Sequence, residues 1–174
     1  MTNQMEKEKL EQQQLEDKLT IACEVIENRL AVLWGAIDSV DTKINIALGF
    51  ASAILGLLAG FYALENRVWP FLSLVLFGLA AVAYILLAIL SILAYRVRGW
   101  SYRPDAKTLL ENCENENYGI VQIKRWVVEE CNTSFYKNLE NLDKKATLAN
   151  CVLVILVVET IMLTSGLAYA LFFG

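Results

Sequence analysis

Three long apolar stretches constrain this 174-residue chain more than any other feature. Residues 44–64 and 71–95 contain no charged side chain, and residues 146–174 contain one, Glu159. A bilayer core about 30 Å thick is crossed by a helix of about 20 apolar residues, and each stretch reaches that length. Strands of a membrane β-barrel alternate in polarity over about 10 residues, which excludes that class. The sequence therefore predicts an all-α integral membrane protein. Its three transmembrane helices are expected at 44–64, 71–95 and 146–172, with a short outer turn at 65–70.

Basic residues lie on one side of the predicted spans. They are Lys43 before the first, Arg96, Arg98, Arg103 and Lys107 after the second, and Lys137, Lys144 and Lys145 before the third. The outer turn has one basic residue, Arg67, and none follows the third span. Because loops rich in Lys and Arg stay in the cytoplasm, we expect the N-terminus and residues 96–145 to be cytoplasmic. The C-terminus is then outside, and the membrane is the cell inner membrane.

An amphipathic segment precedes the first span, within residues 1–43, and another precedes the third. In both, apolar residues recur three and four positions apart. The two series are Leu15, Leu19, Ala22, Ile26, Leu30, Leu33, Ile37, Val40 and Ile44, and then Ile120, Ile123, Val127, Cys131, Phe135, Leu139, Leu142 and Ala146. A repeat near 3.5 residues is typical of coiled-coil helices. We expect two cytoplasmic helices, continuous with spans one and three, that lie parallel with these series facing each other.

Residues 96–118 interrupt this pattern with a segment rich in turn signals. Gly99 permits unusual backbone angles, and Pro104 disfavours helix at the residue before it. Asp105 is placed to cap a short helix that follows. We therefore expect a turn and a short helix here rather than a continuation of the second span.

Two aromatic residues and an arginine, Trp100, Tyr102 and Arg103, lie within this segment. Amphipathic rings beside a cation are typical of residues at the level of the lipid headgroups. Arginine beside stacking aromatics equally suits a nucleotide or another anionic ligand. Both interpretations stay open at the level of sequence.

Small residues follow a helical spacing in the first predicted span. Ser52, Gly56 and Gly60 are four positions apart. Small residues at this spacing let two helix backbones approach closely in lipid. Two partners fit the pattern: the second span of the same chain, or another copy in a homo-oligomer.

Glu159 is the one ionisable residue deep in a predicted span. It lies 14 residues after Lys145, or about 21 Å along a helix. A charged carboxylate at this depth is costly unless it is paired or faces a polar cavity. Three interpretations follow. Glu159 is a protonated residue hydrogen-bonded across helices, where Asn45 and Ser52 are polar neighbours, or it lines a water-filled opening in an oligomer, or it takes part in proton-coupled transport.

Charged residues also lie at the entrance to the first span. Asp38, Asp41 and Lys43 directly precede its apolar residues. The simplest interpretation is a charged collar that prevents the helix from sliding into the bilayer.

Several function classes have no support in the sequence. The chain contains no histidine, which removes histidine acid–base catalysis and most zinc sites. It contains no Walker, GxGxxG or GxSxG motif. The four cysteines lack metal-ligand spacing and are interpreted as small apolar residues. We expect no enzymatic activity, no catalytic residue, no metal or cofactor, and no nucleic-acid polymer as a partner.

The order of these parts resembles a family of small bacterial membrane effectors. Asp41-Thr42-Lys43 opens a span rich in Gly and Ala, and the second span is followed by Trp100-Ser101-Tyr102-Arg103-Pro104-Asp105. Residues 138–146, with the sequence Asn-Leu-Glu-Asn-Leu-Asp-Lys-Lys-Ala, lead into the third span. In this layout, over residues 25–170, the chain resembles the transmembrane effectors of Pycsar anti-phage signalling systems and the related SLATT-type proteins.

The resemblance implies an oligomeric protein that is silent until an infection signal arrives and then perturbs the inner membrane. By this analogy Asp38, Asp41 and Lys43 lie at the inner mouth of an opening, and the cytoplasmic helices receive the signal. The chain has no recognisable cyclic-nucleotide-binding fold. Its expected partner is therefore a cytoplasmic signalling protein, or a cyclic nucleotide that binds the helical segment itself.

Two functions from different classes remain in view. The first is a homo-oligomeric pore or membrane-disrupting effector in anti-phage defence. The second is a non-enzymatic, membrane-anchored scaffold that recruits a partner through the helices at 5–43 and 118–145. A housekeeping channel or transporter is a more distant third.

Overall fold

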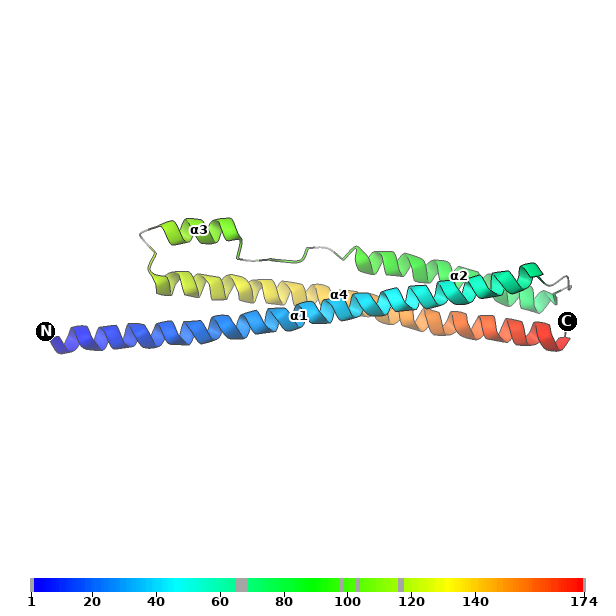
Figure 1. Cartoon of the computed structure of the whole chain (residues 1–174), viewed down its shortest axis with the longest axis horizontal. Helices are drawn as coiled ribbons and strands as arrows, with labels where there is room; N and C mark the ends of the chain where they lie inside the picture. Colours follow the sequence, from blue (N-terminus) through cyan, green and yellow to red (C-terminus); the bar gives the residue numbers. More distant parts are fainter. Residues whose placement is uncertain (1, 65–68, 98, 103, 116–117, 174) are drawn as a thin grey trace. The chain divides into compact units, whose positions relative to one another are not determined.

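Four α-helices make up almost all of the structure. The computed structural model describes residues 2–64, 69–97, 99–102, 104–115 and 118–173. Within these ranges the elements are α1 (Thr2–Leu64), α2 (Phe71–Tyr95), α3 (Ala106–Glu114) and α4 (Ile120–Phe173), with no strand (Figure 1). Three of them, α1, α2 and α4, are long and apolar enough to cross a membrane. The predictions of an all-α protein and of three apolar helices are confirmed.

Some of the predicted features fall on residues that the structure does not describe. These are most of the outer turn, at 65–68, and the two arginines Arg98 and Arg103.

Both α1 and α4 run without a break from the predicted amphipathic segment into the apolar stretch that follows it.

The chain divides into two compact units. The first consists of residues 1–36 and 99–142, and the second of residues 37–98 and 143–174. Helices α1 and α4 therefore contribute to both units. The short helix α3 belongs to the first unit, and α2 belongs to the second.

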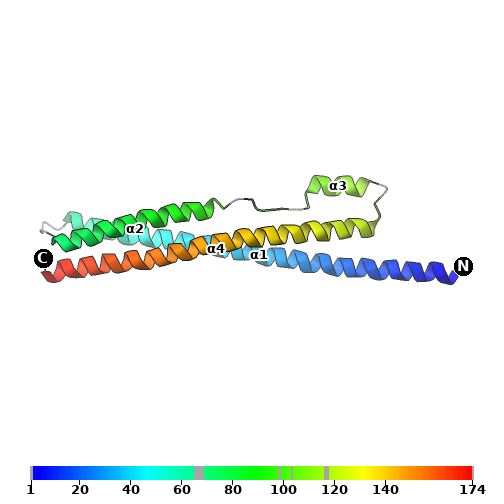
Figure 2. The ribbon, with the colours of Figure 1, turned by 180° about the vertical axis from the view of Figure 1, so that it is seen from behind.

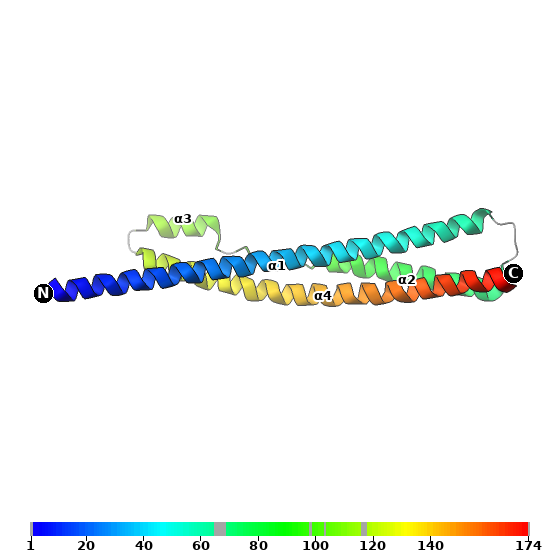
Figure 3. The same ribbon diagram turned by 60° about the horizontal axis from the view of Figure 1, so that its bottom comes forward.

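In the first unit, the early part of α1 lies beside the early part of α4, and both run in the same direction (Figures 1 and 3). The ammonium group of Lys124 in α4 donates to Oε1 of Glu16 at 3.2 Å and to Oγ1 of Thr20 at 2.9 Å. The predicted series in α1 is half-buried from Leu19 and buried at Leu33, although Leu15 is exposed. The amphipathic pattern thus identified the correct face of α1.

The predicted series of α4 in this unit is buried at Cys131 and half-buried at its other members, except Ile120, which is 59% exposed. The most deeply buried positions beside it are two polar residues, Ser134 and Asn138. The reason is that they supply hydrogen bonds to a backbone segment that neither helix nor sheet satisfies.

That segment is residues 99–101, which we call the strap. Gly99 has φ +95°, a conformation that glycine adopts without strain. The Asn138 side chain accepts the Ser101 N–H at 2.7 Å and donates to the Ser101 carbonyl at 2.9 Å. The hydroxyls of Ser101 and Ser134 are 3.1 Å apart, and Asn141 donates to the Gly99 carbonyl at 3.3 Å. Side chains of α4 therefore replace the backbone partners that the strap lacks.

The turn signals after the strap have the predicted effect. Asp105 caps α3, because its carboxylate accepts the Thr108 N–H at 3.4 Å. After α3 the chain turns back, and Gly119 precedes the first residue of α4. The Gly119 N–H donates to the side-chain oxygen of Gln122 at 3.1 Å. This brings α3 alongside the first turns of α4 (Figure 2).

In the second unit, α2 packs antiparallel to the later parts of α1 and α4 (Figure 1). Its core is built of small and branched residues: Ala47, Ala51, Leu87 and Val152 in one cluster and Ile44, Ala94 and Ala149 in another. Small residues permit the close backbone approach that helix association in lipid requires. Among the described glycines the tightest surroundings are at Gly166, where an added Cβ would lie 3.2 Å from Cβ of Leu76 and 3.2 Å from the Phe77 ring.

The substitution Gly166→Leu should separate α4 from α2. Overpacking of this kind lowers the free energy of unfolding by about 1–3 kcal/mol. Unfolding of the purified chain in mixed micelles, followed by circular dichroism during an SDS titration, measures the change. The matched control is Gly78→Leu, because an added Cβ at Gly78 meets nothing within 4 Å. Equal losses in both variants would contradict the close packing at Gly166.

The substitution Asn138→Leu should release the strap from α4. It leaves the Ser101 N–H and carbonyl without their partners, at a cost of about 1–3 kcal/mol for each group that stays buried. Hydrogen exchange at the Ser101 amide should therefore become faster. Asn132→Leu, at an exposed position of the same helix, is the control and should leave that rate unchanged. An unaltered rate in Asn138→Leu would show that the strap is held by other contacts.

Candidate functional site

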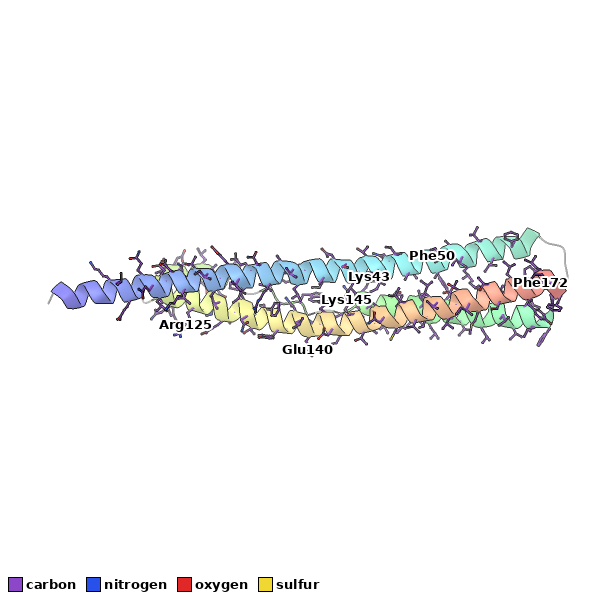
Figure 4. All side chains as sticks on the ribbon, turned by 90° about the horizontal axis from the view of Figure 1, so that it is seen from below. Lys43, Phe50, Arg125, Glu140, Lys145 and Phe172 are labelled. Carbon is purple, nitrogen blue, oxygen red and sulfur yellow. The ribbon has the colours of Figure 1, made fainter. Side chains whose placement is uncertain are left out.

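An ion pair joins α1 and α4 at the start of the apolar stretches. The Lys145 ammonium group donates to Oδ2 of Asp41 at 2.6 Å and lies equally close to Oδ1. The side chain of Lys145 is only 5% exposed and lies between the two helices (Figure 4). The Tyr95 hydroxyl, at the end of α2, donates to the Asp41 carbonyl at 3.3 Å, and the Lys145 nitrogen is 6.0 Å from the Tyr95 ring centre. All three long helices thus meet at one charged contact.

Three charged residues were predicted at the entrance to the first span. Asp41 takes part in this ion pair, whereas Asp38 and Lys43 are exposed. The sequence did not identify Lys145 as the partner of Asp41. Removing one member of such a buried pair leaves the other charge unpaired, which costs more than the pair contributes.

Glu159 is the most unusual residue in the second unit. It is 1% exposed, and neither carboxyl oxygen has a hydrogen-bond partner among the described residues. The two polar neighbours considered from the sequence do not bond to it, because Asn45 is exposed and Ser52 bonds to Leu48 and Tyr84. On its own helix, Thr160 and Thr164 donate to carbonyl groups of α4. The predicted hydrogen bonds between Glu159 and polar residues of neighbouring helices are therefore not formed in this conformation.

The buried face of α4 follows a strict seven-residue repeat. Its members are Cys131, Asn138, Lys145, Val152, Glu159 and Gly166, all of them buried. Three of these six are strongly polar, and the burial of Asn138 was not predicted because the predicted series of α4 contained apolar residues only. The seven-residue spacing of polar residues is the signal that would have found them, since core positions of paired helices recur at that interval.

Ser52 also has a partner within the chain. Its hydroxyl donates to the Leu48 carbonyl at 2.7 Å and lies 2.9 Å from the Tyr84 hydroxyl on α2. This contact across the second unit accounts for one of the three small residues predicted to mediate packing.

Gly56 and Gly60 behave differently from Ser52. A Cβ added at either one would meet nothing within 4 Å, so neither glycine packs against the described part of α2. On another side of this part of α1 lies a cavity of about 370 Å³, lined by apolar residues that include Leu58, Phe77 and Leu163. The last turns of α1 are thus less tightly packed than the turns around Ala47 and Ala51.

Aromatic residues form a separate cluster in the first unit. The Tyr102 ring stacks on Trp34 with centroids 5.0 Å apart and an angle of 10°, and Trp100 lies 5.8 Å from Trp34 at 56°. Trp34 was not singled out from the sequence, because it falls outside the apolar series of α1. Arg103, the third residue predicted here, lies outside the described residues.

All four cysteines lie within the described residues, and none of them forms a disulfide bond. Burial raises the pKa of the Cys131 thiol, and burial together with the nearby Glu27 raises the pKa of the Cys23 thiol. A raised pKa disfavours the reactive thiolate. Across the described ranges, no three His, Cys, Asp or Glu side chains are grouped so as to hold a metal ion.

Comparison with known proteins gives one match. No curated protein and no solved structure matches the chain. The family model of the Pycsar effector protein domain matches residues 26–116, just over half of the chain. The matched region includes Asp41, Ser52 and the whole of α2 and α3, whereas Lys145 and Glu159 lie beyond it. Together with the three apolar helices, this match shows that the chain belongs to the Pycsar effector family of membrane proteins.

Proposed function

We propose that this protein is a homo-oligomeric membrane effector that responds to an anti-phage defence signal by forming a pore in the inner membrane or disrupting it. Membership of the Pycsar effector family supports a role in anti-phage defence. Three helices of membrane-spanning length support action in the bilayer.

The orientation in this proposal follows the basic residues. Residues 1–43 and 96–145 lie in the cytoplasm, residues 44–64, 71–95 and 146–172 cross the inner membrane, and the C-terminus is outside. The first unit then receives the signal, either from a cytoplasmic signalling protein or from a cyclic nucleotide. The protein acts without enzymatic chemistry, metal or cofactor, and without binding a nucleic-acid polymer.

The observation that carries the proposal is Glu159. A protein that needed only an anchor would gain stability from an apolar residue here, because a polar group without partners in lipid costs several kcal/mol. In the silent state, Glu159 is neutral and enclosed by its own helices. In the active state, α1 and α4 move apart next to the loosely packed end of α1, and water reaches the carboxyl group, which ionises and lines the opening.

The substitution Glu159→Gln should abolish membrane depolarisation in cells that make the chain together with its activating partner. Glutamine has nearly the same shape but cannot ionise, so an opening that depends on the carboxylate is lost. Membrane potential, followed with a voltage-sensitive dye, is the measurement. The matched control is Glu114→Gln, the same chemical change at an exposed position of α3, which should depolarise like the natural chain.

Two results would count against the proposal. Depolarisation that survives Glu159→Gln would remove the carboxylate from the conducting path. Membranes that stay intact and polarised under every activating condition would reject a pore or disruption altogether.

The scaffold remains the second candidate, and one observation favours it. In the first unit a groove of about 550 Å³ is lined by apolar residues that include Val32, Phe135 and Leu139. Leu33 also lines this groove, but its side chain is buried, as is that of Ile37 on the same helix. A scaffold would therefore use Phe135 and Leu139, and their replacement by polar residues should release its partner without any change in membrane potential.

A further inference from the structure

Helix α1 has a second face with a seven-residue repeat, and its own chain leaves that face uncovered. One series is Ile21, Asn28, Gly35, Thr42, Gly49 and Gly56. The other is Val25, Val32, Ser39, Ile46, Ala53 and Gly60. The two series alternate at intervals of four and three, the spacing of the core positions of a coiled coil. All twelve positions are exposed, whereas Leu33 and Ile44, on the face toward α4, are buried.

The composition of this face is anomalous for a surface exposed to water. Residues 21–43 include six charged side chains, and none of them falls on either series. Ile21 is 60% exposed and Val32 is 74% exposed. A helix normally places charged residues on the face it presents to solvent, so this face is suited to contact with protein.

The face changes character where α1 becomes apolar. Before the apolar stretch its largest members are branched, as at Ile21, Val25 and Val32. Within the stretch only Ile46 is large, and its other members are small: Ala53 and the glycines Gly49, Gly56 and Gly60, where an added Cβ would meet nothing within 4 Å. Branched residues suit a coiled coil in water, and small residues suit helix contact in lipid.

We propose that this face binds α1 of a second copy of the chain, parallel and in register, and we call the contact the α1 seam. Lipid can cover only the apolar part of the face, and a soluble protein can cover only the part before it. A second α1 covers both parts at once. Copies inserted in one membrane by the same signals share one orientation, which makes their α1 helices parallel.

The charged residues that flank the face support this register. In a parallel pair, the residue just before each member of the Val25 series faces the residue five positions further along the partner helix. Glu24 then faces Arg29 of the second copy, and Asp38 faces Lys43. Both contacts are attractive. The four side chains are exposed, and none has an ion-pair partner among the described residues.

One further feature suits the α1 seam. The groove of about 550 Å³ in the first unit is lined by Val25, Asn28 and Val32 together with Phe135 and Leu139. It offers room beside the seam for branched side chains of the second copy.

The inference rests on the proposed function in one respect, because it names the contact through which the proposed homo-oligomer forms. The α1 seam gives pairs by itself, since the same surface is used on both copies. A larger ring would require a second contact elsewhere on the chain.

Cysteine cross-linking in native membranes tests the α1 seam directly. In a full-length chain whose four cysteines are replaced by alanine, Val32→Cys places a thiol on the face and Glu27→Cys places one off it. Under a mild copper–phenanthroline oxidant, Val32→Cys should give about tenfold more disulfide-linked dimer, because the bond requires Cα atoms within about 7 Å. Equal yields from the two variants would overturn the proposal.

Charge reversal tests the register in the chain with its natural cysteines. Energy transfer between copies labelled at the C-terminus and reconstituted in lipid vesicles reports association. Glu24→Lys should lower the association constant by roughly fivefold, because two symmetry-related attractive contacts become repulsive. Adding Arg29→Glu to Glu24→Lys should restore association. A double variant as weak as the single one would overturn the parallel register.

The two proposals fail in different ways. Chains that cross-link through Val32→Cys but never depolarise cells retain the α1 seam and reject the effector function. Chains that depolarise cells but show neither selective cross-linking nor charge-reversal rescue retain the effector function and reject the seam.

Discussion

The polar groups of the apolar helices must find partners inside the protein, because lipid offers none. Most of them do so in simple ways. Ser91, Thr160 and Thr164 donate to carbonyl groups of their own helices, and Ser52 reaches the Tyr84 hydroxyl. Lys145 is held by Asp41, which joins α1 to α4 where the apolar stretches begin. Two buried polar side chains of the second unit lack such partners among the described residues, namely the Ser73 hydroxyl and the Glu159 carboxyl group.

The unsatisfied state of Glu159 connects structure with function. Stability alone does not explain a buried carboxyl group without partners, and such a group favours any conformation in which water reaches it. The end of α1 is loosely packed, and it is the part of the second unit that would move in such a conformational change. Membership of the Pycsar effector family favours an effector over a passive anchor.

Seven-residue repeats organise both long helices. On α4 the repeat from Cys131 to Gly166 is buried against the chain itself, although half of its members are strongly polar. On α1 one face packs within the chain, and the other is exposed at every position from Ile21 to Gly60 on its two series. A helix with two such faces can join a folded chain to a neighbour without rearrangement of either contact.

The sequence by itself determined the helical class, the three apolar helices and the buried face of α1, because hydrophobic length and period are local properties. Asp105 and Gly99 likewise act within a few residues, so the cap and the turn could be predicted. The tertiary structure alone decided which polar residues are buried and with what partners. Asn138 binds the strap 37 residues earlier in the chain, and Lys145 binds Asp41 across 104 residues. Whether a polar side chain is satisfied depends on atoms brought near by packing, and periodicity along one helix does not contain that information.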